Sequence, residues 1–282
     1  MKLKQYLLCM ILSNMSSEED YKPPGNTEKI WNQTSRWRPI QLEILKAEFI
    51  NGEILNLDNI DTIQLDPDVE RILLSGIDIK TEKNISKIHR PFYNRLIQLT
   101  TFIDEPPVDS VAHDLLTYTG YEDQILHFRP KPHLEMVWQG YDISSEADYG
   151  VYSERSRETS YKEYLVVVED KPERRKSYQG GECQLYGEML LAAFNRYTQK
   201  KQDQIVYGII IRGPFIRFYK SNITKEYLKD IERDKTPLTK AISKRFPSDD
   251  EYPLSLNITK EREKIIRILH LIRKDVEDIV KN

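Results

Sequence analysis

The sequence has few cysteines, no long apolar run and almost no net charge. Its 282 residues include only Cys9 and Cys183, which are too few for a disulfide scaffold or a cysteine-based zinc site. No stretch approaches the roughly 18 apolar residues that a membrane-spanning helix needs, so no membrane partner is expected. Because a reducing environment suits two free thiols, the sequence predicts an intracellular location, the nucleus included.

Glycine and proline are also scarce. With 11 glycines and 14 prolines, the composition excludes collagen-like and low-complexity classes. The 42 Lys and Arg residues nearly balance the 45 Asp and Glu residues, which gives a formal net charge of −3. Proteins that coat nucleic acid by electrostatic attraction carry a positive excess, and this chain has none.

The first hundred residues are expected to begin with a polar segment and to continue as helices. The opening MKLKQYLLCMILS has the outline of a signal peptide, so secretion is an alternative, but its apolar run is no longer than a buried strand or half a helix. We assign residues 1–35 to a flexible N-terminal segment and 36–104 to a helical region. Apolar spacing predicts helices from Arg38-Pro39 to Ile50, from near Asp66-Pro67 to Gly76, and from about Asn84 past Leu99.

The first of these segments, Arg36 to Phe49 (RWRPIQLEILKAEF), resembles the first helix of a homeodomain. The third helix offers Pro91-Phe92-Tyr93-Asn94 where a homeodomain recognition helix carries Trp-Phe-x-Asn, and the proline is expected to kink it. Helical packing or an accessory cap is therefore favoured over DNA reading by this region.

The middle of the chain, residues 105–220, alternates between helices and strands. Helices are expected from Glu105 to a stop at Gly120 and from about Glu182 to Tyr197. Strands are expected at 125–128, 134–138, 147–152, 164–168, 205–211 and 215–219. This order predicts an α/β or α+β fold in which helices flank a mixed sheet.

Carboxylates lie at the ends of two of these strands, where core packing alone would not place them. The apolar strand 165–168 runs directly into Glu169-Asp170-Lys171, and alternation puts Glu169 and Lys171 on one face. The preceding strand carries Asp148. If the two strands pair, Asp148 and Glu169 bring oxygen ligands within reach of one Mg²⁺ ion, with Lys171 beside it. Charged strand ends that emerge into solvent are the alternative.

The next helix, Cys183–Phe194, is largely apolar and carries two polar side chains on one face. Gln184 and Glu188 are four residues apart and therefore stack along the helix. If they are buried they need polar partners, which an adjacent metal or phosphate site would supply. An exposed helix face is the alternative.

In this order, Asp148, Glu169-x-Lys171 and Gln184 resemble the motifs of the PD-(D/E)XK nuclease superfamily, with its α-β-β-β-α-β core. The stretch VVVEDKPERR…ECQLYGEMLLAAF resembles more closely the nuclease-like domains of Crinkler-type effectors and related fungal proteins. The likeness covers about residues 105–220. It implies a restriction-endonuclease-like sheet there, and residues 221–282 are assigned to a C-terminal helical extension.

The resemblance also implies a role for each matching residue. Asp148 and Glu169 would bind Mg²⁺, with Mn²⁺ as the alternative ion, and Lys171 would be the catalytic lysine. Gln184 would support the site or contact nucleic acid. The chain departs from the superfamily pattern at Ala147, which stands where the family name has proline. The implied reaction is hydrolysis of phosphodiester bonds in nucleic acid, with DNA favoured.

The first core helix of the family often supplies a further acid to the metal. Glu105 is the candidate at the start of that helix, with Asp109 and Asp114 as competitors. The cluster Arg174-Arg175-Lys176 directly follows the proposed site, on the loop before the next helix, where phosphates could lie. A solvated loop is the alternative for that cluster.

Two further functions stay open. One is a nuclease fold that serves as an effector or binding module without turnover, and the other is a helical DNA-binding or protein-interaction protein. The helix predicted from Thr259 to Lys281 bears on the second, because its apolar stripe either packs on the sheet, which is favoured, or pairs with a partner protein.

Overall fold

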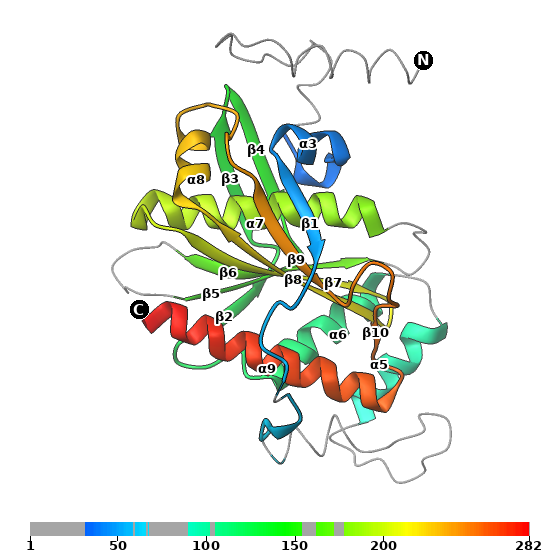
Figure 1. The fold of residues 1–282 in the computed structure, drawn as a ribbon. Coiled ribbons are helices and arrows are strands. Elements are labelled where there is room, and N and C mark those ends of the chain that lie inside the picture. Colours follow the sequence, from blue (N-terminus) through cyan, green and yellow to red (C-terminus); the bar gives the residue numbers. More distant parts are fainter. Residues whose placement is uncertain are drawn as a thin grey trace, which may run out of the picture.

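A mixed β-sheet lies at the centre of the molecule, with helices on both of its faces (Figure 1). The computed structural model describes residues 32–58, 60–65, 67, 90–101, 105–153, 162–171 and 178–281. In chain order its elements are η1 (Thr34–Arg36), α3 (Pro39–Ile44), β1 (Ala47–Asn51), η2 (Ile60–Thr62), α5 (Arg90–Thr101), α6 (Glu105–Tyr118), β2 (His127–Pro130), β3 (His133–Trp138), β4 (Tyr141–Glu146), β5 (Tyr149–Ser153), β6 (Glu163–Lys171), α7 (Tyr178–Lys200), β7 (Gln204–Arg212), β8 (Phe215–Ile223), α8 (Lys225–Glu232), β9 (Ala241–Phe246), β10 (Leu254–Ser255) and α9 (Thr259–Lys281).

The sheet has eight strands in the order β1-β9-β8-β7-β6-β5-β2, with β10 paired to β8. Antiparallel pairs join β2 to β5, β5 to β6, β7 to β8 and β8 to β9, whereas β6–β7 and β1–β9 are parallel. A parallel pair needs a crossover connection, and α7 supplies it between β6 and β7. The predicted class, a mixed sheet flanked by helices, is confirmed.

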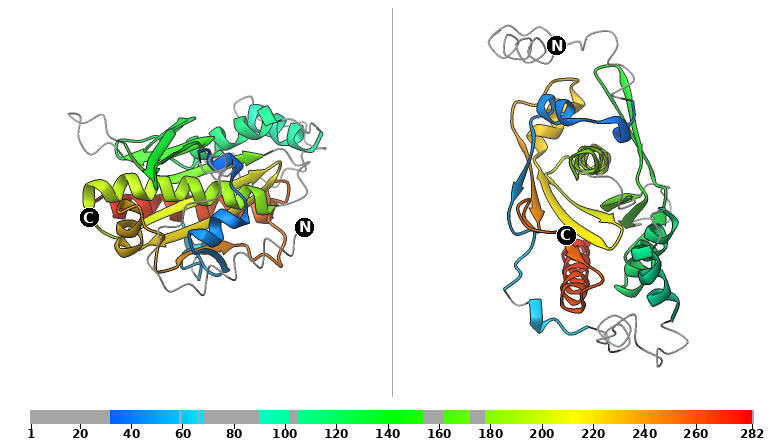
Figure 2. Two further views of the ribbon diagram at one scale, coloured as in Figure 1. Left: turned by 90° about the horizontal axis from the view of Figure 1, so that it is seen from above. Right: turned by 90° about the vertical axis from the view of Figure 1, so that its right-hand side faces the viewer.

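The side chains of β6 and β7 divide the core into two layers. Val167 and Ile210 pack with α7 on one face of the sheet, whereas Val168 and Ile209 pack with α6 and α9 on the other. Figure 2 shows α7 and α9 on opposite sides of the sheet. Strand β6 is buried along almost its whole length because residues 165–168 are all apolar, as expected of a strand covered on both faces.

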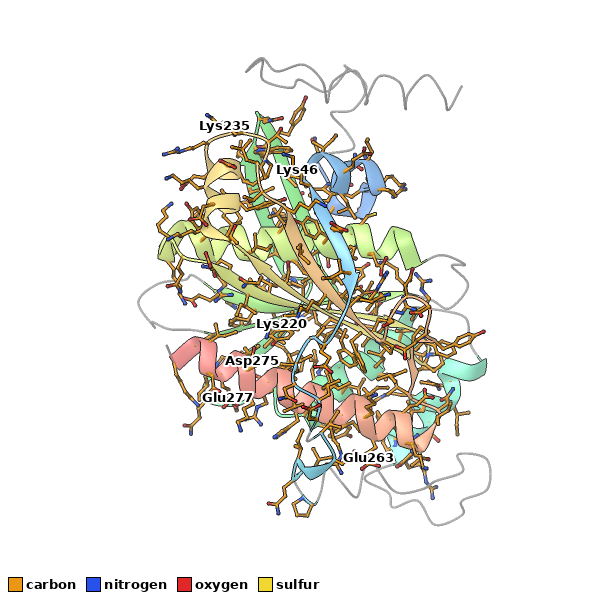
Figure 3. All side chains as sticks on the ribbon, viewed as in Figure 1. Lys46, Lys220, Lys235, Glu263, Asp275 and Glu277 are labelled. Carbon is orange, nitrogen blue, oxygen red and sulfur yellow. The ribbon has the colours of Figure 1, made fainter. Side chains whose placement is uncertain are left out.

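The C-terminal helix α9 packs on the sheet, as predicted. Five members of its apolar stripe are buried in the core layer that also holds Val168, and the sixth, Ile279, is partly buried against it. The buried five are Ile265, Ile268, Leu269, Ile272 and Val276. An ion pair also ties the helix to β8, because Asp275 Oδ2 lies 3.2 Å from Lys220 Nζ (Figure 3). The apolar stripe is therefore used within this chain.

The helix expected from Arg38 to Ile50 is wrong in its second half. Helix α3 ends at Ile44, Lys46 adopts a positive φ of 49°, and the chain continues as β1, which pairs with β9. The segment 36–49 is therefore not a homeodomain-like helix. Of the helix expected from Asn84, α5 covers residues 90–101 and carries Pro91 at its second position, where a missing N–H costs no intrahelical bond.

Several sequence predictions for the N-terminal part fall on residues that the structure does not describe. These are the flexible segment up to residue 31 and the helix from 66 to 76, apart from Pro67. The sheet also draws strands from both sides of the predicted core 105–220: β1 precedes it, β9 and β10 follow it, and β8 crosses residue 220. Among the described residues, no helix is long and apolar enough to cross a membrane.

Candidate active site

Glu169 and Lys171 lie at the end of the central strand β6 and point toward α7. Alternation along the strand puts them on the same face as Val167, and Asp170 on the opposite face. Glu169 is fully buried, and its Oε1 contacts Lys171 Nζ. Its second oxygen, Oε2, has no hydrogen-bond partner among the described residues. The predicted carboxylate and ammonium are therefore in contact at the end of a buried strand.

Asp148 lies beside this strand end, in the bend between β4 and β5 rather than within a strand. Its backbone N–H donates to the carbonyl of Val168 at 3.1 Å, and its Oδ2 accepts the backbone N–H of Asp170 at 2.7 Å. Its Oδ1 contacts Lys131 Nζ. The structure thus anchors Asp148 to the residue that follows Glu169, as the pairing of the two strands predicts.

Gln184 and Glu188 face the same part of the protein from α7. Gln184 Nε2 donates to Glu188 Oε1 at 3.0 Å, and Ser145 Oγ of β4 donates to the same oxygen at 3.1 Å. Thr34 of η1 donates to Ser145 Oγ at 2.7 Å. Glu188 is fully buried and its Oε2 has no hydrogen-bond partner among the described residues. The exposed helix face considered as the alternative is therefore wrong.

The charge of Glu188 is coupled to the strand-end residues. Burial raises the pKa of the Glu188 carboxyl from 4.5 to about 7, and the negative charge of Asp148 adds to the rise. Hydrogen bonds from Gln184 and Ser145, together with the positive charge of Lys171, oppose it. The carboxyl therefore exchanges its proton near neutral pH. The polar face of α7 and the end of β6 belong to one electrostatic site.

The further acid expected from the first core helix is best placed at Asp109. Although burial opposes the change, contact with Asp148 and the charges of Asp170 and Asp109 raise the pKa of Lys131. Asp114 instead contacts Arg95 of α5. Helix α6 begins at Glu105, whose side chain lies outside the described residues. Among the described candidates, Asp109 is the one whose charge acts on the site.

The donor chemistry fits a hard cation such as Mg²⁺, although within the described ranges no three His, Cys, Asp or Glu side chains form a complete metal site. Buried charged oxygens are paired or coordinate metals, and Glu169 Oε2 has no hydrogen-bond partner in the part of the chain that the structure describes. Carboxylate oxygens are the ligands that Mg²⁺ prefers, usually with several waters retained. The cluster Arg174, Arg175 and Lys176 lies outside the described residues.

A polar cavity of about 220 Å³ opens beside the α7 network. Its lining includes Thr34, Ser145 and Gln184, all of which belong to the hydrogen-bond chain that ends at Glu188, and also His133 of β3. Hydroxyl and amide groups thus separate the buried carboxyl from the surface.

Sequence reasoning missed three members of this site, Ser145, Thr34 and Lys131. Glu188 was recognised with Gln184, because it lies one helical turn later in an apolar helix. Ser145 lies in β4 and Thr34 in η1, neither of which the hydrophobic pattern indicates. Lys131 lies in the turn after β2 at a positive φ of 49°. These three are brought in by tertiary structure alone.

Comparison with models of protein families and with curated proteins finds no match for this chain. The function must therefore be argued from the residues of the site themselves.

Proposed function

We propose that this protein is a Mg²⁺-dependent nuclease with a restriction-endonuclease-like core that hydrolyses phosphodiester bonds in nucleic acid, with DNA favoured. The observation that carries the proposal is the contact of Glu169 and Lys171 at the end of β6, with Asp148 bonded to the next residue of that strand. A Glu-Lys pair at a strand end, with Glu169 fully buried and Lys171 largely buried, is costly for stability alone, because both charges lose most of their hydration.

The order of the elements supports the same proposal. Helix α6 is followed by β2, β5 and β6, each antiparallel to the one before, and then by α7 and by β7 parallel to β6. This is the α-β-β-β-α-β order of the PD-(D/E)XK core. The hairpin β3–β4 is an insertion between β2 and β5.

Each side chain has a defined task in this reaction. Asp148 and Glu169 would hold Mg²⁺, and the ion would supply the acidity that activates a water and the positive charge that offsets the phosphate oxygens. Lys171 places an ammonium beside Glu169, where it stabilises the negative charge that develops on the phosphate during attack. Gln184 and Ser145 fix the orientation of Glu188, which holds or releases a proton near neutral pH.

A second candidate is a nuclease-fold effector or binding module without turnover. Both carboxylate oxygens of Asp148 already have partners, one the backbone N–H of Asp170 and the other Lys131 Nζ. An ammonium in contact with a metal ligand competes with the metal for it. A fold that keeps this contact permanently would bind nucleic acid without cleaving it.

The experiment compares cleavage of plasmid DNA, linear DNA and RNA with Mg²⁺ or with EDTA. Glu169→Gln and Lys171→Met keep the side-chain volumes, and Glu146→Gln changes an exposed glutamate of β4 as the matched control. The first two variants are expected to lose at least about 100-fold in rate, and the control is expected to match the wild type.

Folding of each variant is checked by circular dichroism, and binding of a labelled duplex by fluorescence anisotropy. Cleavage by Glu169→Gln at the wild-type rate would exclude this site. Duplex binding without cleavage by the wild type would favour the binding module.

A further inference from the structure

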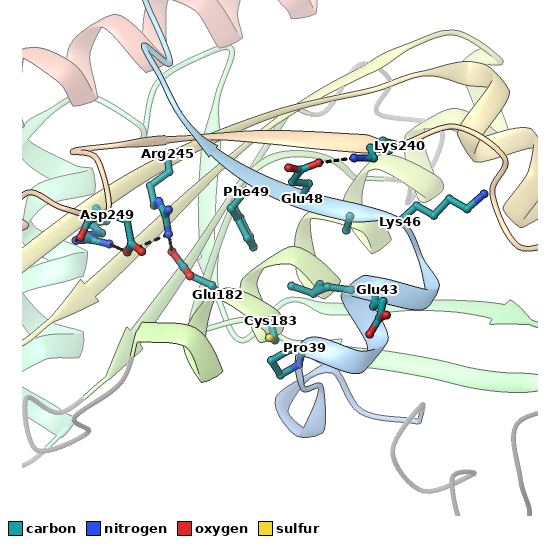
Figure 4. Close-up of a pocket in the computed structure, with 13 residues that line it drawn as sticks. Pro39, Glu43, Lys46, Glu48, Phe49, Glu182, Cys183, Lys240, Arg245 and Asp249 are labelled. Atoms are coloured by element: carbon teal, nitrogen blue, oxygen red, sulfur yellow. Dashed lines mark hydrogen bonds and ion pairs between the residues drawn. The ribbon is translucent and has the colours of Figure 1, made fainter. Parts of the chain in front are cut away.

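A second pocket, of about 910 Å³, lies between β1, β9 and the first turns of α7 (Figure 4). None of the site residues Asp148, Glu169, Lys171, Gln184 and Glu188 lines it. Its floor contains two arginines, Arg217 of β8 and Arg245 of β9, whose side chains are only 4% and 10% exposed. Buried guanidinium groups need negatively charged partners. The group that supplies this negative charge therefore determines which ligand the pocket can bind.

Both arginines contact the same carboxylate oxygen, Asp249 Oδ1. Arg217 Nη1 lies 3.0 Å from Asp249 Oδ1, and Arg245 Nη1 lies 3.1 Å from the same oxygen. Asp249 follows β9, and its side chain is 62% exposed. Figure 4 shows the Asp249 carboxylate on one side of the Arg245 guanidinium group and Glu182 on the other. A largely solvated carboxylate therefore reaches inward to a point where two buried cations converge.

Asp249 is one of two carboxylates that contact the arginines, and Arg217 Nη2 also donates to the backbone carbonyl of Glu251 at 2.9 Å. Arg245 Nη1 also lies 2.9 Å from Glu182 Oε1, which accepts the hydroxyl of Tyr219 at 3.0 Å. Glu182 is buried on α7 and is a fixed part of the floor. The two arginines thus contact one fixed carboxylate, that of Glu182, and one exposed carboxylate, that of Asp249. When Asp249 moves away, both arginines lose their contact with its carboxylate in a place of low solvent access, and an outside anion gains by replacing it.

We propose that Arg217 and Arg245 form a phosphate-binding site, which the Asp249 carboxylate occupies in this structure and which a phosphate monoester takes over by displacing Asp249. Guanidinium groups match phosphate oxygens geometrically, and a phosphate monoester carries more charge at pH 7 than a carboxylate. Pockets of about 300–1,000 Å³ hold ligands larger than inorganic phosphate, so this one has room for the rest of a nucleotide. The phosphate belongs either to a free nucleotide or to the end of a nucleic-acid strand.

The site does not depend on the proposed nuclease activity, since the two share no residue. Lys46 and Lys240 line the same pocket near its other end (Figure 4). Lys240 Nζ lies 2.9 Å from Glu48 Oε2, so its charge is already partly offset. The arginine pair is the part of the pocket where two buried cations converge on one point.

Asp249→Ala removes the internal competitor, and Asp250→Ala removes an equal charge from the neighbouring exposed residue. Both variants leave the arginines intact. Isothermal titration calorimetry with inorganic phosphate, adenosine 5′-monophosphate and adenosine measures the dissociation constants. We expect Asp249→Ala to bind the monophosphate about tenfold more tightly than the wild type. Asp250→Ala is expected to match the wild type, and adenosine is expected to bind none of the proteins.

A pair of oligonucleotides of one sequence, with a 5′-phosphate or a 5′-hydroxyl, separates the two sources of the phosphate. Tighter binding of the phosphorylated strand than of the free monophosphate assigns the site to strand ends, and the reverse assigns it to nucleotides. Equal affinities of the Asp249→Ala and Asp250→Ala variants would overturn the proposal, because the arginine pair would then be only an anchor for the chain after β9. Equal binding of adenosine and its monophosphate, or no binding of phosphate by any protein, would overturn it as well.

Discussion

One buried carboxyl, that of Glu188, should make the stability of the folded protein depend on pH between about 4.5 and 7. This side chain has no solvent exposure, and burial raises its pKa from 4.5 to about 7. The substitution Glu188→Gln keeps the size of the side chain and the oxygen that accepts hydrogen bonds from Gln184 and Ser145, but it removes the ionisable carboxyl. The difference between the two proteins therefore isolates the free energy of ionising this one group.

The sign and size of the effect follow from the two pKa values. Below pH 4.5 the carboxyl is protonated in both the folded and unfolded states. Between pH 4.5 and about 7 the unfolded chain loses this proton while the folded protein keeps it, so stability falls as pH rises. A pKa difference of one corresponds to about 1.4 kcal/mol, so the complete loss, reached above about pH 7, is about 3 kcal/mol.

The assay is urea unfolding of the wild type and Glu188→Gln in EDTA at a series of pH values from 4.5 to 8. We expect the free energy of unfolding of Glu188→Gln to gain about 3 kcal/mol relative to the wild type across this range. Glu146→Gln, an exposed substitution on β4, should run parallel to the wild type. A constant difference between wild type and Glu188→Gln at all pH values would refute the reasoning, because the carboxyl would then titrate equally in both states.

Two further predictions concern packing and are measured by urea unfolding at one pH. Gly187→Ala should cost about 1–3 kcal/mol, because a Cβ there would lie 2.6 Å from Thr34 Cγ2 and 2.8 Å from Thr34 Cβ. Gly208→Ala should cost less, since its Cβ would meet the ends of flexible side chains; equal losses would contradict this account. Ile268→Ala on the buried stripe of α9 should cost about 2–5 kcal/mol. The half-exposed Ile258→Ala should stay within about 0.5 kcal/mol, and a similar loss in both would show that α9 does not pack as described.

The parts of the fold that hydrophobic patterns predict are those whose burial is uniform or strictly periodic. Strand β6 is apolar at residues 165–168, and α9 repeats its apolar residues on one face, so both were predicted within a few residues of their bounds. The segment 38–50 has apolar residues that also fit a helix. Its second half becomes β1 because Lys46 takes a positive φ and the strand pairs with β9, about 190 residues later in the chain.

The candidate site shows a similar division. Glu169 and Lys171 were found because they follow an apolar strand, and Asp148 because the preceding strand was expected to pair with it. Lys131 and Ser145 were not found, because their sequence neighbours carry no chemical pattern. The pairing of β2 with β5 brings Lys131 to Asp148, and the packing of the β3–β4 hairpin against α7 brings Ser145 to Glu188. A site assembled from several elements shows in the sequence only at the residues with a local signal.

Helix α7 connects the two sites in this protein because it is covered on every side. All residues from 181 to 194 are buried, since the sheet lies on one side and η1, α3 and the β3–β4 hairpin lie against others. A helix without a solvent face cannot carry polar side chains unless each has a buried partner. Gln184 donates a hydrogen bond to Glu188, which also accepts one from Ser145 and is stabilised by the positive charge of Lys171. On another face of the helix, Glu182 accepts a hydrogen bond from Arg245. The polar residues of this helix therefore lie at both of the proposed sites.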